Sequence, residues 1–86
     1  MREFTYTVKD PEGLHTRRAG LLAMRAKAFR DTDITVSSEG RTVKTSQLMQ
    51  LISMGIKRGS RVTVAAEGPQ ENDAIDIVQS FFEYYL

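Results

Sequence analysis

The sequence predicts an α+β fold, an open-faced two-layer sandwich in which three helices cover one face of a four-stranded antiparallel sheet. Four short segments alternate apolar and polar residues and three longer ones repeat apolar residues at helical spacing, in the order strand, helix, strand, strand, helix, strand, helix. Strands with one apolar side need a covering layer, which amphipathic helices supply. Because no repeat or linker interrupts the 86 residues, we expect a single domain over residues 1–86.

The first half of the chain predicts strand, helix and hairpin. Residues 4–8 alternate as in a half-buried strand, and Asp-Pro-Glu-Gly at 10–13 ends the pattern. A helix over about residues 16–29 follows. Two β-rich segments, 34–36 and 41–43, flank a Ser-Glu-Gly turn and are expected to pair as an antiparallel hairpin. The apolar stripe of the helix comprises Ala19, Leu22, Ala23, Ala26 and Phe29.

The second half predicts helix, strand and helix. Apolar residues at helical spacing over 48–52 indicate a short helix that ends near Gly55. Alternation over 62–66 indicates the fourth strand, and the acidic residues at 71 and 73 suit the start of a final helix. Its buried stripe is expected to comprise Ala74, Ile77, Val78, Phe81 and Tyr85.

Composition excludes several classes of function. Twelve basic and eleven acidic residues give a net charge of +1, which does not favour a nucleic-acid binder. Without cysteine and with one histidine, the chain has no thiol nucleophile or usual metal site, so we expect no metal and no other cofactor. No signal-peptide pattern or apolar run near ~20 residues is present, so we expect a cytoplasmic protein without membrane insertion.

Residues 13–19, Gly-Leu-His-Thr-Arg-Arg-Ala, carry the clearest functional signal, because the predicted helix begins beside the only histidine, His15. The first N–H groups of a helix have no partners within it and, with the positive end of the helix dipole, favour an anion. Arg17 adds a guanidinium that suits phosphate oxygens. A neutral imidazole is a nucleophile and later a leaving group. The pattern predicts a phosphoryl group carried on His15 and bound by the backbone N–H groups of Thr16 and Arg17.

Three segments together resemble one known family. They are residues 13–17, Leu48-Met49 with Ser-Met-Gly-Ile at 53–56, and Val-Thr-Val-Ala-Ala-Glu-Gly at 62–68. These segments are similar to the active-site loop, the second helix with its exit, and the last strand of the phosphocarrier HPr family of the bacterial sugar phosphotransferase system. The resemblance covers essentially the whole chain and implies the same order of strands and helices.

The resemblance also implies a role. In that family a histidine accepts a phosphoryl group from enzyme I, itself charged by phosphoenolpyruvate, and passes it to an EIIA domain of a sugar transporter. Such a protein is a phosphoryl carrier rather than a stand-alone enzyme. His15 would carry the phosphoryl group on Nδ1, with Arg17 facing it. We expect a monomer whose partners are enzyme I, EIIA domains and an HPr kinase or transcriptional regulator. The implied partner-docking residues are Leu14, Thr16, Lys27, Leu48, Met49 and Ile52.

Two positions depart from the family pattern. Arg18 stands where the family usually has proline, which restores a backbone N–H and adds a possible second cation at the phosphate site. Gln47 stands where Gram-positive members have a regulatory serine, and Ser46 lies one residue earlier. Ser46 is therefore a candidate for regulatory phosphorylation, although its hydroxyl would equally suit a helix cap.

Plainer structural and functional alternatives stay open. In one alternative, His15 has only the structural role of capping its helix. In another, Leu48 belongs to the core, because its spacing with Leu51 and Ile52 places it on their side of the helix. The departures at Arg18 and Gln47 also suit a regulatory HPr-like paralogue that binds a transcription factor or enzyme. An RNA-binding sheet is a third possibility, but the sequence shows neither a basic stripe nor aromatic residues interleaved along strands.

Overall fold

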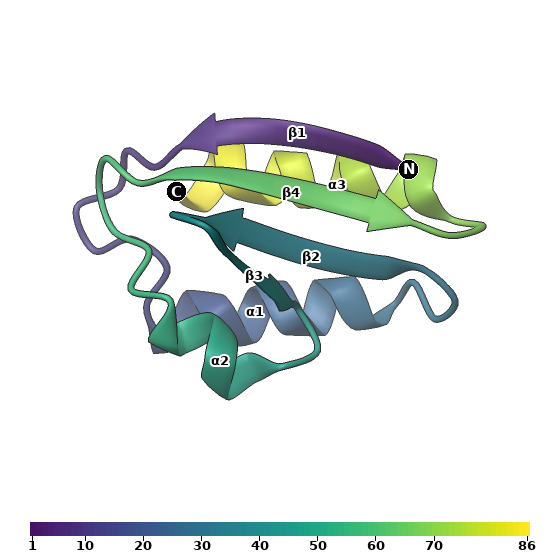
Figure 1. The fold of residues 1–86 in the computed structure, drawn as a ribbon, viewed down its shortest axis with the longest axis horizontal. Helices are drawn as coiled ribbons and strands as arrows, with labels where there is room; N and C mark the ends of the chain where they lie inside the picture. The colour runs from purple at the N-terminus through teal and green to yellow at the C-terminus, as the bar shows by residue number, and fades with distance from the viewer.

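The computed structural model describes all residues, 1–86, and its four strands form one antiparallel sheet in the order β1-β4-β2-β3 (Figure 1). Residue Phe4 pairs with Val64, and Val36 pairs with both Val64 and Val43, so apolar residues align across the sheet. The elements are β1 (Arg2–Thr7), α1 (Thr16–Lys27), β2 (Asp33–Ser38), β3 (Arg41–Lys44), α2 (Leu48–Ser53), β4 (Arg61–Glu67) and α3 (Glu71–Tyr85). The predicted element order is confirmed.

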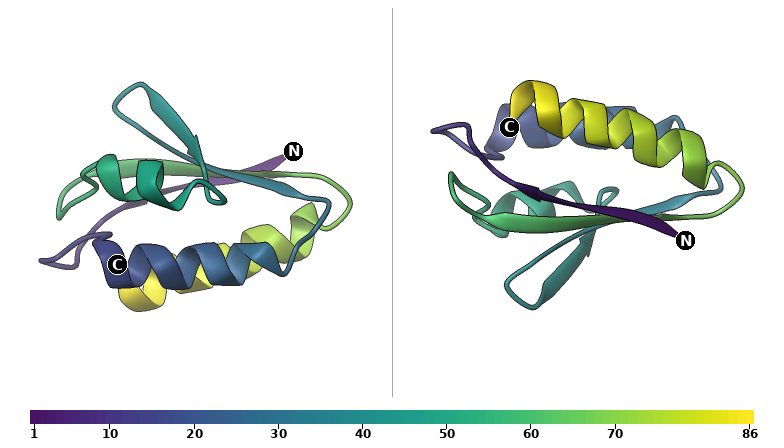
Figure 2. Two further views of the ribbon diagram at one scale, coloured as in Figure 1. Left: turned by 90° about the horizontal axis from the view of Figure 1, so that it is seen from below. Right: turned by 90° about the horizontal axis from the view of Figure 1, so that it is seen from above.

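The helices leave one face of the sheet open. Figure 2 shows α1 and α3 side by side in a layer against the sheet, and α2 packs against α1 near β3. The expected α+β sandwich is confirmed. The first helix ends at Lys27, two residues before the predicted end, because the chain tightens into a turn in which the Phe29 N–H donates to the Ala26 carbonyl. No helix is both long and apolar enough to cross a membrane.

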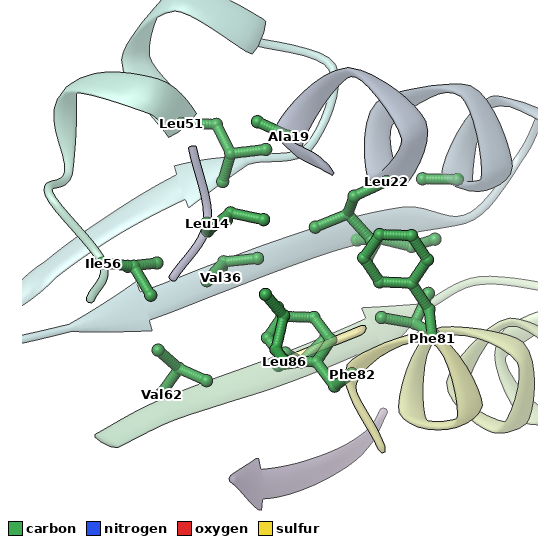
Figure 3. Packing of buried hydrophobic residues seen from close by; sticks show 14 of the residues in the cluster. Leu14, Ala19, Leu22, Val36, Leu51, Ile56, Val62, Phe81, Phe82 and Leu86 are labelled. Atoms are coloured by element: carbon green, nitrogen blue, oxygen red, sulfur yellow. The ribbon is translucent and has the colours of Figure 1, made fainter. Parts of the chain in front are cut away.

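The core lies between the sheet and the helix layer. Leu22 from α1, Leu51 from α2, and Phe81 and Phe82 from α3 are almost completely buried there (Figure 3). The ring of Phe82 contacts the rings of Phe4 and Tyr6 edge to face, at centroid distances of 5.7 and 5.8 Å. These contacts join α3 to β1, the strand that leads into the candidate site.

The predicted buried stripe of α3 is partly wrong. Ile77 is 44% exposed, whereas Ile75 and Phe82 are buried. Helix α3 packs against both the sheet and α1, so its buried face is wider than one stripe and is turned toward Ile75 and Phe82. Ala74, Val78 and Phe81 are buried as predicted, and Tyr85 is half-buried.

Candidate functional site

The loop between β1 and α1 is attached to two distant segments through its backbone. The N–H groups of Lys9 and Asp10 both donate to the carbonyl of Leu86, at the end of α3. Farther along, the Leu14 N–H donates to the Ile56 carbonyl at 3.0 Å. Figure 1 shows this loop and the C-terminus at the same end of the molecule. The segment that leads to His15 is therefore fixed by backbone contacts.

Gly13 and Leu14 anchor this loop against the rest of the protein. Gly13 has φ +65°, and a Cβ atom there would overlap the Ile56 carbonyl oxygen and lie 2.6 Å from the Lys57 Cα. The Leu14 side chain is only 2% exposed and belongs to the core. The expectation that Leu14 lies in the partner-docking surface is wrong, because its side chain packs inward and fixes the position of His15.

His15 is the residue immediately before α1. Its backbone is extended, with φ −84° and ψ −179°, and its carbonyl accepts the Ala19 N–H. The imidazole makes no capping hydrogen bond, so the alternative in which His15 merely caps the helix is wrong. The N–H groups of the first turn, including those of Thr16 and Arg17, thus stay available for an anion. The His15 side chain is 37% exposed, which leaves the ring accessible.

A surface hollow of about 310 Å³ adjoins the imidazole. Glu12 Oε2 lies 3.4 Å from His15 Nε2, while the exposed Arg17 has no ion pair. The hollow thus combines one carboxylate, two guanidinium groups and the imidazole. Its lining residues are Glu12, His15, Arg17, Arg18, Leu21 and Tyr85.

Arg18 is paired rather than free. Its Nη1 atom donates to Asp10 Oδ2 at 2.8 Å and to the Tyr85 carbonyl at 2.6 Å, and its guanidinium lies 5.8 Å from the centre of the Tyr85 ring. The expected second phosphate cation therefore has its charge matched by a carboxylate. In this position Arg18 joins the loop, the first turn of α1 and the end of α3, whereas Arg17 keeps the unpaired charge.

This pairing lowers the pKa of the Asp10 carboxyl. The hydrogen bond from Arg18 lowers the pKa of Asp10 below its ordinary value of 3.8, burial opposes this, and the Glu12 N–H lowers it further. A depressed folded-state pKa stabilises the protein above the unfolded-state pKa. That stabilisation is lost as the pH falls through the folded-state value.

We therefore expect Asp10→Asn to be less stable than the parent at neutral pH, with the difference shrinking below about pH 4. Urea unfolding followed from neutral pH to about pH 2 measures this difference. Asp76→Asn, at an exposed position on α3, is the control and should show no such trend. A difference for Asp10→Asn that stays constant with pH would contradict the assignment.

Four of the six expected docking residues are at least partly accessible and lie on α2 or at the start of α1. Thr16, Met49 and Leu48 are exposed, with Met49 77% and Leu48 37% accessible, and Ile52 is half-buried. The assignment of Leu48 to the core is wrong, because Leu51 fills the inward position of α2. Figures 1 and 2 show α2, which contains Leu48, Met49 and Ile52, beside the N-terminal half of α1, the helix that begins directly after His15.

Lys27 lies apart from that surface. It is the last residue of α1, and about 18 Å of helix axis separates it from His15 at 1.5 Å per residue. It borders a different hollow, together with Arg30, Lys44 and Ser46. Lys27 is exposed, but the structure does not bring it to the rim of the His15 site.

Ser46 is not a helix cap. The capping position of α2 is Gln47, which makes no side-chain cap hydrogen bond, and Ser46 is exposed. The preceding Thr45 is buried, and its hydroxyl donates to the Ile34 carbonyl. The capping alternative for Ser46 is therefore wrong, and its phosphorylation stays a prediction.

Sequence reasoning missed three contributors to the site: Asp10, Glu12 and Tyr85. Glu12 precedes His15 by three residues, so its proximity was detectable from spacing alone. The contact between Arg18 and Tyr85 joins residues 67 positions apart, and no local pattern signals it.

The chain is similar to known phosphocarrier proteins over most of its length. The family model described as PTS HPr component phosphorylation site matches residues 2–84. The phosphocarrier protein HPr of Vibrio cholerae is 41% identical over 76 residues, which are 88% of each protein. A solved histidine-containing phosphocarrier protein from Mycoplasma covers 93% of this chain and 90% of its own, with TM-score 0.88 and 29% identity.

The fold is also similar to that of a second solved protein over its full length. Crh, the Bacillus subtilis catabolite repression containing protein, covers 100% of this chain and 99% of its own, with TM-score 0.77 and 26% identity. The match of the family model extends over almost the entire sequence, including the loop, α2 and β4. The chain therefore belongs to the HPr phosphocarrier family of the phosphotransferase system.

Proposed function

We propose that this protein accepts a phosphoryl group on His15 from phosphorylated enzyme I and passes it to EIIA domains of sugar transporters. The observation that carries the proposal is the accessible, uncapped imidazole at the first turn of α1, next to the unpaired Arg17, in a chain of the HPr family. In this role the protein is a cytoplasmic monomer, and residues 1–86 act as one unit.

On this protein, the proposed transfer uses only His15 and the donor groups of Thr16 and Arg17 at the start of α1. The lone pair of His15 Nδ1 attacks phosphorus, and the leaving group of the donor protein departs with the electron pair of its bond to phosphorus. The phosphoryl oxygens then accept hydrogen bonds from the N–H groups of Thr16 and Arg17 and from the Arg17 guanidinium. An exposed site moderates these interactions through competing water, which suits a carrier that must release its phosphoryl group.

Incubation with enzyme I and radiolabelled phosphoenolpyruvate tests the proposal. We expect one acid-labile label per chain, located on His15, and its transfer to an added EIIA domain. Failure to acquire the label from a preparation of enzyme I that phosphorylates an authentic HPr would overturn the proposal.

Arg17→Ala should slow phosphoryl acceptance about 10- to 100-fold, because a charge-assisted hydrogen bond is worth ~1.5–3 kcal/mol. Since Arg17 is exposed and has no ion pair, the free energy of unfolding should change by less than about 0.5 kcal/mol. Stopped-flow transfer rates and urea unfolding measure the two effects. Arg58→Ala, another exposed arginine without an ion pair, is the control, and equal rates for Arg17→Ala and the parent would exclude Arg17 from the mechanism.

Met49→Ala should raise the KM for enzyme I about fivefold, because this exposed thioether supplies an adaptable docking contact. Its 77% exposure means that the melting temperature should not change measurably. Ile77→Ala, which removes an exposed apolar side chain from α3, is the control. A similar KM for both variants would remove Met49 from the docking surface.

A regulatory role is the second candidate, and the exposed Ser46 and the similarity to Crh favour it. In this role the protein is phosphorylated by an HPr kinase on Ser46 and binds a transcriptional regulator. Treatment with an HPr kinase and ATP, followed by mass spectrometry, tests the step. An unmodified Ser46, or a modification that persists in Ser46→Ala, would exclude it.

A further inference from the structure

We propose that Glu12 is a positioning residue that holds the proton of the neutral His15 ring on Nε2 and so leaves the Nδ1 lone pair for attack on phosphorus. The kinetic consequence rests on the proposed function, whereas the position of the proton does not. The carboxylate is the only acidic group that lines the hollow beside the ring.

The first observation is the distance of 3.4 Å between His15 Nε2 and Glu12 Oε2. A neutral imidazole carries its proton on one of two nitrogens, and an acceptor beside one nitrogen favours the form that donates to it. The other charged groups at the hollow are Arg17 and Arg18, which have no acceptor to offer the ring. Glu12 therefore favours the Nε2–H form. We expect the distance between Nε2 and the Glu12 carboxylate to shorten when a partner protein covers the site.

The second observation is that the main chain at Glu12 is held in place. The Glu12 N–H donates to Asp10 Oδ2 at 2.9 Å, and Arg18 Nη1 donates to the same oxygen at 2.8 Å. The Gly13 N–H donates to the Asp10 carbonyl at 3.1 Å. The Glu12 side chain is 71% exposed, and from this fixed backbone its carboxylate extends to within 3.4 Å of Nε2.

This arrangement gives Glu12 two effects on transfer. Before attack, it increases the fraction of rings whose Nδ1 bears a lone pair. When the bond from Nδ1 to phosphorus forms, the ring keeps its Nε2 proton and gains positive charge, which the carboxylate stabilises. The electron pair of the broken bond leaves with the donor protein, so Glu12 neither gains nor loses a proton in the step. Arg18 contributes indirectly, through Asp10.

Ring-nitrogen NMR chemical shifts of selectively labelled His15, recorded at alkaline pH where the ring is neutral, test the proposal without any partner protein. We expect the Nε2–H form to dominate in the parent and its ratio to the Nδ1–H form to fall about two- to fivefold in Glu12→Ala. Asp10→Asn should produce a smaller fall. Glu3→Gln, at an exposed position on β1, is the control and should match the parent.

The kinetic arm separates this proposal from the proposed function. If enzyme I phosphorylates the parent, Glu12→Ala should reduce kcat/KM by at least the fold-change seen in the fraction of rings in the Nε2–H form, while unfolding in urea stays unchanged. A ratio identical in the parent and in Glu12→Ala, or altered equally by Glu3→Gln, would overturn the role of Glu12. If the parent protein acquires no phosphoryl group, the proposed function is overturned. The NMR measurement then still decides whether Glu12 sets the position of the ring proton.

Discussion

Replacement of His15 by alanine is expected to abolish phosphorylation by enzyme I while leaving the fold intact. The imidazole supplies the only proposed attacking atom, and no other histidine or cysteine exists in the chain to replace it. The ring makes no capping hydrogen bond and its one ion-pair partner is an exposed carboxylate, so its removal should change the free energy of unfolding by less than about 0.5 kcal/mol. Label incorporation and urea unfolding measure the two outcomes.

Lys57→Ala is a suitable control for this experiment, because Lys57 is exposed and belongs to the segment that supports the loop. It should accept phosphoryl groups at a rate close to that of the parent. Acid-labile label that persists on His15→Ala would show that a different residue is phosphorylated. Loss of the fold in His15→Ala would instead assign the ring a structural role.

Gly13→Ala should lower the free energy of unfolding by about 2–5 kcal/mol and greatly reduce phosphoryl acceptance. A left-handed backbone is unfavourable for alanine, and the new Cβ would overlap the Ile56 carbonyl oxygen. Relief of this overlap requires the loop to move away from the Ile56–Lys57 backbone, which breaks the hydrogen bond from Leu14. For a domain with an expected total of ~4–13 kcal/mol, this is a large fraction.

Gly55→Ala separates the two causes. Its φ of +68° nearly equals that of Gly13, but apart from its own neighbours in the chain no atom lies within 4 Å of the position of its Cβ. The free energy of unfolding of Gly55→Ala should therefore fall only by the cost of a left-handed backbone for alanine, about 1–2 kcal/mol, and phosphoryl transfer should be retained. Chemical denaturation of both variants gives the comparison. Equal destabilisation would mean that contact with Ile56 contributes nothing and that the loop is free to shift.

The strands and helices were predictable because most residues follow the period of their element. Val62, Val64 and Ala66 alternate inward along β4, and Ala19, Leu22 and Ala26 face inward at helical spacing on α1. Rotation about a helix axis is harder to predict. In α3 both Ile75 and Ile77 are apolar, and only contact with two neighbouring layers decides which of them is buried.

The site was predictable where it depends on neighbours in sequence. The position of His15 directly before α1 follows from Gly13 and the helical pattern after it. The inward direction of Leu14 depends instead on the distant Ile56 carbonyl, and the pairing of Arg18 depends on where α3 ends. Such contacts are set by tertiary packing, so a local pattern gives no sign of them.

The attachment of the loop to Leu86 makes the two ends of the fold interdependent. The carbonyl of this single residue accepts the N–H groups of both Lys9 and Asp10, and its side chain is only 3% exposed. Loss of this acceptor would leave the two amides, at five and six positions before the histidine, without a hydrogen-bond partner. Amide hydrogen exchange at Lys9 and Asp10 would accelerate accordingly, and the loop would hold the imidazole less rigidly.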